Sequence, residues 1–380
     1  MRFREEFLNM GKDRLYYVQI VVITTLLVYA TGLLALPRNV TNIAGTAGWM
    51  SIIVGGLVGL LIGLMTANIA LQYPDMSFTQ ICESACGRTF GKVISFSFFI
   101  YTSFILAVGM LQFATTIAVP FLNEMRTEVI VIVSFLVLMY ATSKGIGAIA
   151  RFTFISFAVV FVSLVAIILL SNSIVDTGRL LPLMGRGAVP ILDAGLETAS
   201  LFGEVIILLA ILKYFPRKNL MKRAISQGII LAMVIMTTIV AACIAIFGTT
   251  WVERFAFPMV ELAKLVGMGE FFERVEILFL TLWFNTAILK LSLLYYVSVT
   301  CLNDLLDLKN YRRLILPYAV FAIGFTLLPD NMVESSTMLA YFREYSIFYV
   351  LAIVLVLTIC TKVKQHRNGK RSDTANCAVK

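Results

Sequence analysis

Ten apolar stretches, each close to the length that crosses a lipid bilayer, constrain this chain more than any other feature. A helix needs about 20 residues to cross about 30 Å of hydrocarbon. Of the 380 residues, 59% are hydrophobic and 14% are charged, which excludes an ordinary soluble enzyme and indicates an all-α integral membrane protein. The predicted transmembrane spans are 15–36, 45–70, 91–119, 127–143, 149–171, 189–212, 223–247, 275–299, 314–329 and 343–361.

The positions of the basic residues predict the orientation of these spans. When both termini are placed in the cytoplasm, most of the 31 Lys and Arg residues flank cytoplasmic ends, as the positive-inside rule requires. We therefore predict a cytoplasmic N-terminus over 1–14, a ten-helix transmembrane domain over 15–361 and a basic cytoplasmic tail over 362–380. The net charge of +9 comes from basic residues beside the spans and on the tail, where they would contact anionic membrane lipid. No nucleic-acid partner is therefore expected.

The sequence contains no recognisable catalytic or metal-binding constellation. The one histidine is His366, in the tail, and Cys82 and Cys86 face a reducing compartment in this topology, so neither a zinc site nor a disulfide is expected. A nucleophile elbow and a phosphate-binding Gly-Lys-Ser/Thr loop are also missing from the sequence. We expect no enzyme activity, no metal and no cofactor.

Two loop segments indicate an internal repeat. YPDMSFTQICESACGRTFGKV (73–93) follows the second span and FPMVELAKLVGMGEFFERV (257–275) follows the seventh. Apolar residues recur at helical spacing in both, which predicts two short interfacial helices. The charges put the first inside and the second outside, so spans one to five (about 15–171) and six to ten (about 189–361) would form a 5+5 inverted repeat, as in many secondary transporters. The alternative is a coincidental match between two loops.

Polar and helix-breaking residues interrupt the first span of each half. YATGLLALP (29–37) places Thr31 and Gly32 ahead of Pro37, where we expect helix one to end. DAGLETASLFGEV (193–205) places polar residues and glycines in the apolar run of span six. Broken helices 1 and 6 at equivalent places in two halves predict a binding site near the bilayer midplane. The alternative is that these small residues only let helices pack closely.

Glu204 and Lys290 are among the ionisable residues inside predicted spans. Such a group costs at least about 2.5 kcal/mol in hydrocarbon and usually marks a functional position, so Glu204 and Lys290 are candidates for coupling or gating. The alternatives are a cytoplasm-facing contact for Glu204 and a snorkelling anchor at the inner interface for Lys290. Tyr101 in span three and Asn285 and Thr286 in span eight offer further polar groups, which helix packing explains equally well.

These motifs resemble those of the amino acid/polyamine/organocation transporter superfamily. TGLLALP is similar to its glycine-rich helix-one motif, with Ala30 in place of the first glycine, and LFGE (201–204) is similar to its sixth-helix motif. The order of TGLLALP, QYPDMSFTQICESACGRTFGK and FPMVELAKLVGMGEFFERVEILFLTLWFNTAILK resembles more specifically the B subunits of spore germination receptors, across nearly the whole chain.

The resemblance implies a nutrient-sensing subunit of the spore inner membrane that works with an A and a C subunit and triggers germination. Its germinant would be a small molecule such as an amino acid, bound between helices one, three, six and eight. The resemblance also suggests that the ammonium of Lys290 replaces a bound sodium ion against carbonyls at Thr31 and Gly32. The implied ligand-binding residues are Thr31, Gly32, Leu33, Tyr101, Glu197, Thr198, Ser200, Phe202, Gly203, Asn285 and Thr286.

Two other functions are compatible with the same residues. The first is a proton-coupled amino acid permease, and the second is a ligand-gated ion path through the subunit. Binding, alternating access and gating use one architecture, so the sequence does not separate them.

Overall fold

The helices of the structure follow the predicted spans. The computed structural model describes residues 14–121, 126–266, 275–328 and 332–377, and this part of the chain contains helices and no strand. The first half consists of α2 (Tyr17–Ala44), α3 (Gly48–Gln72), α5 (Arg88–Phe121), α6 (Thr127–Lys144) and α7 (Ile146–Leu170). The second consists of α8 (Ala188–Gly203), α9 (Met221–Phe247), α12 (Val275–Leu305), α13 (Ile315–Thr326) and α14 (Met332–Cys377). Each predicted span therefore coincides with a helix.

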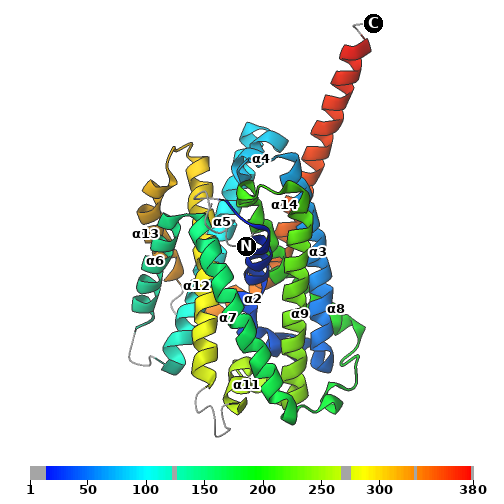
Figure 1. Ribbon diagram of the computed structural model, residues 1–380, viewed down its shortest axis with the longest axis vertical. Coiled ribbons are helices and arrows are strands. Elements are labelled where there is room, and N and C mark those ends of the chain that lie inside the picture. The colour runs from blue at the N-terminus through cyan, green and yellow to red at the C-terminus, as the bar shows by residue number, and fades with distance from the viewer. Residues whose placement is uncertain (1–13, 122–125, 267–274, 329–331, 378–380) are drawn as a thin grey trace, which may run out of the picture.

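The length and composition of these helices identify an integral membrane protein. Within the described residues, seven helical stretches are long and apolar enough to cross a membrane, and Tyr17–Ala30 forms a shorter apolar helix. The 16-residue α8 is extended by a 3-10 helix over Glu204–Ala210. α14 projects beyond the other helices, so that residues 362–377 of the predicted tail continue this helix (Figure 1).

The two predicted interfacial helices are present and lie at opposite ends of the bundle (Figure 1). They are α4 (Phe78–Cys86), where Ser77 caps the first turn by accepting a hydrogen bond from the main-chain N–H of Gln80, and α11 (Pro258–Val266). Their buried apolar positions include Phe78, Ile81 and Cys82 in α4 and Met259, Leu262 and Ala263 in α11. The opposite placement supports the inverted repeat, while the side of the membrane on which each helix lies stays a prediction.

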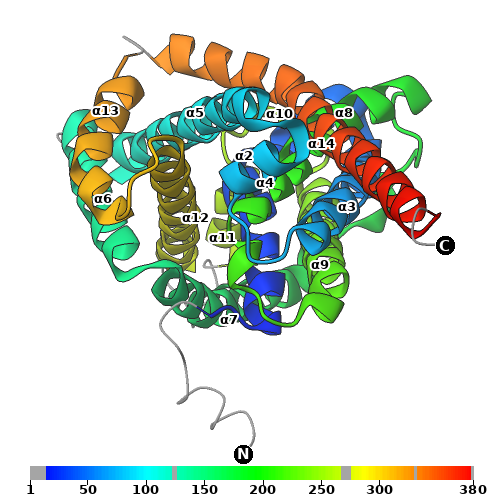
Figure 2. The same cartoon turned by 90° about the horizontal axis from the view of Figure 1, so that it is seen from above.

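Helix pairing in the bundle is reciprocal between the two halves. α2, the first helix of one half, packs chiefly against α9, the second helix of the other, and α8 packs chiefly against α3 in the same way. Seen from above, α2 lies near the middle of the bundle, with α12 on one side and α3 and α9 on the other (Figure 2). Two halves related by a pseudo-two-fold axis produce this exchange of partners.

Threonine and glycine bring each of these helix pairs close together. A Cβ added at Gly228 of α9 would lie 2.5 Å from the Cβ of Thr24 in α2, and the neighbouring Thr25 hydroxyl donates to the Gly228 carbonyl over 3.0 Å. In the other pair, Gly55 of α3 lies against Thr198 of α8, whose hydroxyl donates to the Ser51 carbonyl over 3.0 Å. Small residues allow membrane helices to approach closely, because dispersion contacts rather than water exclusion hold them together.

The expectation that the first helix ends at Pro37 is wrong. α2 is a single helix from Tyr17 to Ala44, and Pro37 lies inside it. A proline removes one N–H and leaves the carbonyl four residues earlier without its helical partner, which kinks a helix without having to end it. The second expected break is confirmed, because α8 ends as an α-helix at Gly203 and continues with 3-10 geometry.

We expect Gly55→Ala to destabilise the protein by about 3 kcal/mol, the upper end for overpacking of a core. The added Cβ would lie 2.2 Å from the Thr198 Oγ1 atom and 2.8 Å from the main-chain nitrogen of Ala199, which has no room to move. The matched control is Gly324→Ala in α13, where a Cβ meets nothing within 4 Å. Thermal unfolding of the purified protein in detergent measures both, and equal midpoints for the two variants would contradict the packing argument.

Candidate functional site

Glu204 stands where the α-helical part of span six ends. Its main-chain N–H bonds to the carbonyls of Leu201 and Phe202, and its side chain is buried. The carbonyls of a helix C-terminus carry a partial negative charge, and the Glu204 carboxylate adds a full one. Buried negative charge of this kind requires a cation close by.

Lys290 of α12 supplies that cation. Its Nζ atom lies 2.7 Å from the Glu204 Oε2 atom, and the exposed fractions of the two side chains are 0% and 6%. The alternative of a snorkelling anchor at the membrane interface is excluded, because the ammonium is enclosed and paired inside the bundle. Sequence reasoning singled out both residues as separate candidates, and the structure joins them.

Trp283 fixes the same face of α12 against α2. It precedes Lys290 by two helical turns, and its indole N–H donates to the Ala30 carbonyl over 3.0 Å in a buried contact. The Ala30 carbonyl, next to the predicted break at Thr31 and Gly32, is therefore bonded to α12. Sequence reasoning missed Trp283, the residue that makes this bond. The contact expected between Lys290 and the Thr31 and Gly32 carbonyls stays a prediction.

Tyr101 of α5 lies within electrostatic range of Glu204. Its ring stacks on that of Tyr349 in α14, with 4.7 Å between the ring centroids. The Tyr349 hydroxyl lies 3.1 Å from the Ser97 hydroxyl. Ser346, one turn earlier on α14, is buried, and its hydroxyl has no hydrogen-bond partner among the described residues. α5, α8, α12 and α14 thus meet around Glu204.

Several other candidate residues make contacts between or within helices. The Thr198 hydroxyl bonds to α3, the Ser200 hydroxyl donates to the Glu197 carbonyl over 2.6 Å, and Phe202 packs on Gly59. These contacts are what close helix packing requires, and they leave any role in ligand binding as a prediction.

The remaining candidates fall on different faces. The Glu197 carboxylate accepts a hydrogen bond from the Asn39 side chain over 3.4 Å, and Leu33 is buried in the core. Thr286 is buried and bonds to the Trp283 carbonyl of its own helix over 2.8 Å. With about 3.6 residues per turn, Asn285 points away from the face that carries Lys290.

Gly32 faces protein on the side where a side chain would project. A Cβ there would lie 2.5 Å from the Met236 Cε atom of α9 and 3.2 Å from the Leu201 Cδ1 atom of α8. The glycine therefore lets three helices meet at the level of Ala30 and Glu204. This contact favours the packing alternative for Gly32.

Two inverted halves around a buried ion pair at the end of a half-helix define a protein with the architecture of a secondary transporter. Among solved structures, Mhp1, a nucleobase-cation-symport-1 family transporter in a closed conformation with bromovinylhydantoin bound, is similar with a TM-score of 0.65 and 14% identity, over 88% of this chain and 78% of that one. The chain belongs to the spore germination protein family, whose model matches residues 14–334.

Individual relatives agree with this assignment. Spore germination protein YndE of Bacillus subtilis (strain 168) is 26% identical over 73% of this chain and 77% of its own length. Spore germination protein GerLB of Bacillus cereus is 20% identical over 90% and 92%. A manganese transporter of Eremococcus coleocola shares the fold, with a TM-score of 0.60 and 13% identity over 91% and 75%. The chain is thus a membrane protein of spore germination with a transporter-like fold, and its family is not one of enzymes.

Sequence signals for the missed residues exist in hindsight. Trp283 shares a helix face with Lys290, and Tyr349 places a hydroxyl directly before the apolar stretch 350–357 of α14. Neither signal predicts which residue the side chain contacts, because Ala30 and Tyr101 lie on helices distant in sequence.

We expect Lys290→Met to lower the free energy of unfolding by about 3–5 kcal/mol, since it leaves the Glu204 carboxylate buried without its ammonium. The double variant Lys290→Met with Glu204→Gln should recover most of that loss. Thermal unfolding of the two single variants and the double variant gives the coupling energy between Lys290 and Glu204. If the losses of stability in the single variants simply add up in the double variant, the two residues do not interact directly.

The matched control is Lys92→Met. Lys92 pairs with Asp307 over a similar 2.8 Å, but the exposed fractions of the two side chains are 31% and 67%. The hydrogen bond and charge of Lys92 lower the pKa of the Asp307 carboxyl. Water replaces such an exposed contact when it is lost, so this variant should unfold at nearly the wild-type temperature.

We expect Gly32→Val to lower the free energy of unfolding by about 1–3 kcal/mol through overpacking against Met236. Adding Met236→Ala makes room for the new side chain and should restore most of the stability. Thermal unfolding of both variants checks this, and a failure of Met236→Ala to rescue would show that Gly32 does more than admit Met236.

Proposed function

We propose that this chain is the nutrient-sensing membrane subunit of a spore germination receptor and that it binds a small zwitterion such as an amino acid beside the Glu204–Lys290 pair. The observation that carries the proposal is this buried pair of opposite charges, at the end of α8, in a chain of the spore germination family. A zwitterion presents the same two charges. Its ammonium can take the place of Lys290 at the carboxylate while its own carboxylate meets Lys290, so no buried charge is left uncompensated.

Binding would act by population shift. A ligand that inserts between Glu204 and Lys290 favours any arrangement in which α8 and α12 stand slightly apart, by its difference in affinity for the two arrangements. The altered helix positions would be read by the A and C subunits of the receptor in the spore inner membrane, with both termini of this chain in the cytoplasm. Candidate binding residues beside the pair are Tyr101 and Gly203.

A proton-coupled amino acid permease is the second candidate. The observation that favours it is the fold, because the similar solved structures have the names of transporters. A ligand-gated ion path is a third use of the same site. The three differ in what crosses the membrane: nothing, the amino acid, or an ion.

We expect the purified protein to bind radiolabelled L-alanine, used as a probe for neutral zwitterions, and Glu204→Gln to weaken that binding at least tenfold. Lys92→Met should bind as the wild type does, because its ion pair lies at the surface. Absence of binding by any neutral L-amino acid would reject the ligand class. Accumulation of the probe in proteoliposomes under a proton gradient would favour the permease.

A further inference from the structure

A segment between the two halves lies across the α11 end of the bundle. We call residues 176–187 the strap. Its Asp176 N–H donates to the Ala245 carbonyl at the end of α9 over 3.1 Å, and its Pro182 carbonyl accepts from the Thr46 hydroxyl after α2 over 2.6 Å. Gly185 has a positive φ, and a Cβ there would lie 2.3 Å from the Ala44 carbonyl oxygen. The strap is therefore fitted closely onto the ends of two helices.

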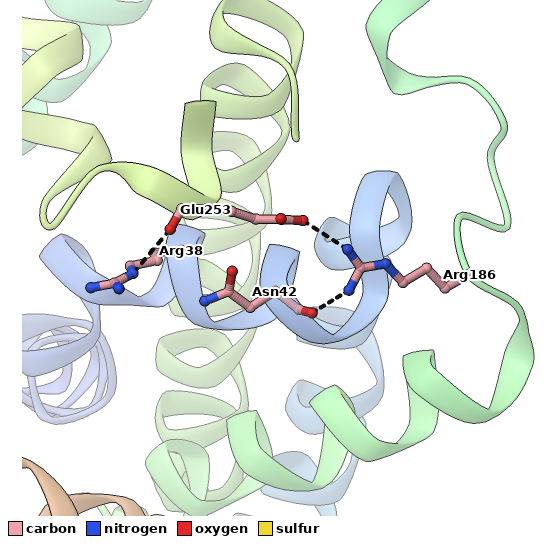
Figure 3. Close-up of polar contacts among 4 residues, drawn as sticks. All are labelled: Arg38, Asn42, Arg186 and Glu253. Atoms are coloured by element: carbon pink, nitrogen blue, oxygen red, sulfur yellow. Dashed lines mark hydrogen bonds and ion pairs between the residues drawn. The ribbon is translucent and has the colours of Figure 1, made fainter. Parts of the chain in front are cut away.

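An ionic clasp holds the strap and the end of α2 to α10 (Thr249–Arg254) (Figure 3). The Arg186 guanidinium lies 3.0 Å from the Glu253 carboxylate and also donates to the Asn42 carbonyl. Arg38 donates to the Glu253 carbonyl over 3.2 Å. The exposed fractions of the Arg186 and Glu253 side chains are 50% and 28%, so water has access to the clasp.

The α4 end includes contacts of a different kind, which are partly buried. The Leu15 N–H donates to the Tyr214 carbonyl over 3.0 Å, which ties the two halves together, and the Tyr214 and Tyr296 hydroxyls lie 3.0 Å apart. Tyr296 is buried and packs edge-on against Tyr311, whose hydroxyl donates to the Thr142 carbonyl over 3.4 Å. The contact between Tyr311 and Thr142 again joins the two halves, whereas the other two contacts lie within the second half.

The two kinds of contact differ in how easily they separate. Water substitutes for an exposed ion pair when it opens, so the clasp contributes little to keeping its end shut. Separating the partly buried hydroxyls and carbonyls of the α4 end leaves polar groups that water reaches less easily, which costs more. The α11 end is therefore the end that opens at lower cost.

Pro37 lies between the clasp and the candidate site. It follows Ala30, which Trp283 holds at the site, and immediately precedes Arg38, which belongs to the clasp. A helix lacks one hydrogen bond and bends readily at a proline. Residues 38–44 can therefore swing on Pro37 when the clasp opens, while the part of α2 at the site stays in place.

We infer that the α11 end is the entrance for the ligand, gated by the strap and the ionic clasp with Pro37 as hinge, and that the α4 end stays closed. This one-sided access deepens the proposed function on which it rests: it suits a sensor, which has to admit and release its ligand on the same side, rather than a permease.

Access to the site can be measured without a ligand. Ser346→Cys, on a background without native cysteines, places a thiol one turn from Tyr349, and a membrane-impermeant methanethiosulfonate reagent is applied to either side of oriented proteoliposomes. We expect modification from the α11 side only, and Glu253→Gln should speed it roughly two- to fivefold, as the loss of an exposed ion pair allows. Modification from the α4 side, or from neither side in any variant, would overturn the inference.

Two exposed ion pairs serve as matched controls. Asp75→Asn removes a 3.0 Å pair with Lys218 at the α4 end, and Glu261→Gln removes a 2.9 Å pair with Lys264 within α11 itself. Neither pair joins the strap to α10, so both variants should react at the wild-type rate. Equal acceleration by all three changes would mean that general loosening, and not the clasp, sets the rate.

Adding L-alanine to the same assay separates this inference from the proposed function. Protection of the Ser346→Cys thiol with access from the α11 side alone supports both. One-sided access without protection by any neutral L-amino acid keeps the gate and rejects the ligand class. Protection with equal access from both sides keeps the ligand class and rejects the one-sided gate.

Discussion

The buried ion pair between Lys290 and Glu204 imposes the strictest geometric condition on this bundle. Removing two charges from water costs several kcal/mol for each ion, and only close approach in a fixed geometry offsets it. α8 has to stop at Gly203 for Glu204 to stand at a helix end, and α12 has to keep Lys290 and Trp283 on one face. Because Trp283 also bonds to the Ala30 carbonyl, the pair and its neighbour hold α2, α8 and α12 in register.

The framework that meets this condition is made by close helix packing. Gly55 opposite Thr198 and Gly228 opposite Thr24 let the first helix of each half lie against the second helix of the other. Such a crossed pairing makes the centre of the bundle stiff, since four helices share it. Movement is then left to peripheral parts with exposed contacts, of which the strap and its clasp are the clearest case among the described residues.

Local patterns predicted much of the fold. Hydrophobic length found the ten helices, because a bilayer sets that length, and helical spacing of apolar residues found α4 and α11. The error at Pro37 has a clear reason: a proline removes one hydrogen bond, and whether a helix then ends depends on what packs around it. Gly32 was similarly ambiguous, since a glycine accommodates either a ligand or a neighbour such as Met236.

The sequence by itself determined the helices, the repeat, the family and the two buried charges, because hydropathy and the cost of an ion in lipid act residue by residue. Only the tertiary structure decided that Lys290 meets Glu204, that Trp283 reaches Ala30 and that Arg186 joins Asn42 to Glu253. Each of these contacts depends on the crossing and rotation of helices or loops far apart in the chain. Those angles follow from the packing of many side chains at once, which no single stretch of sequence specifies.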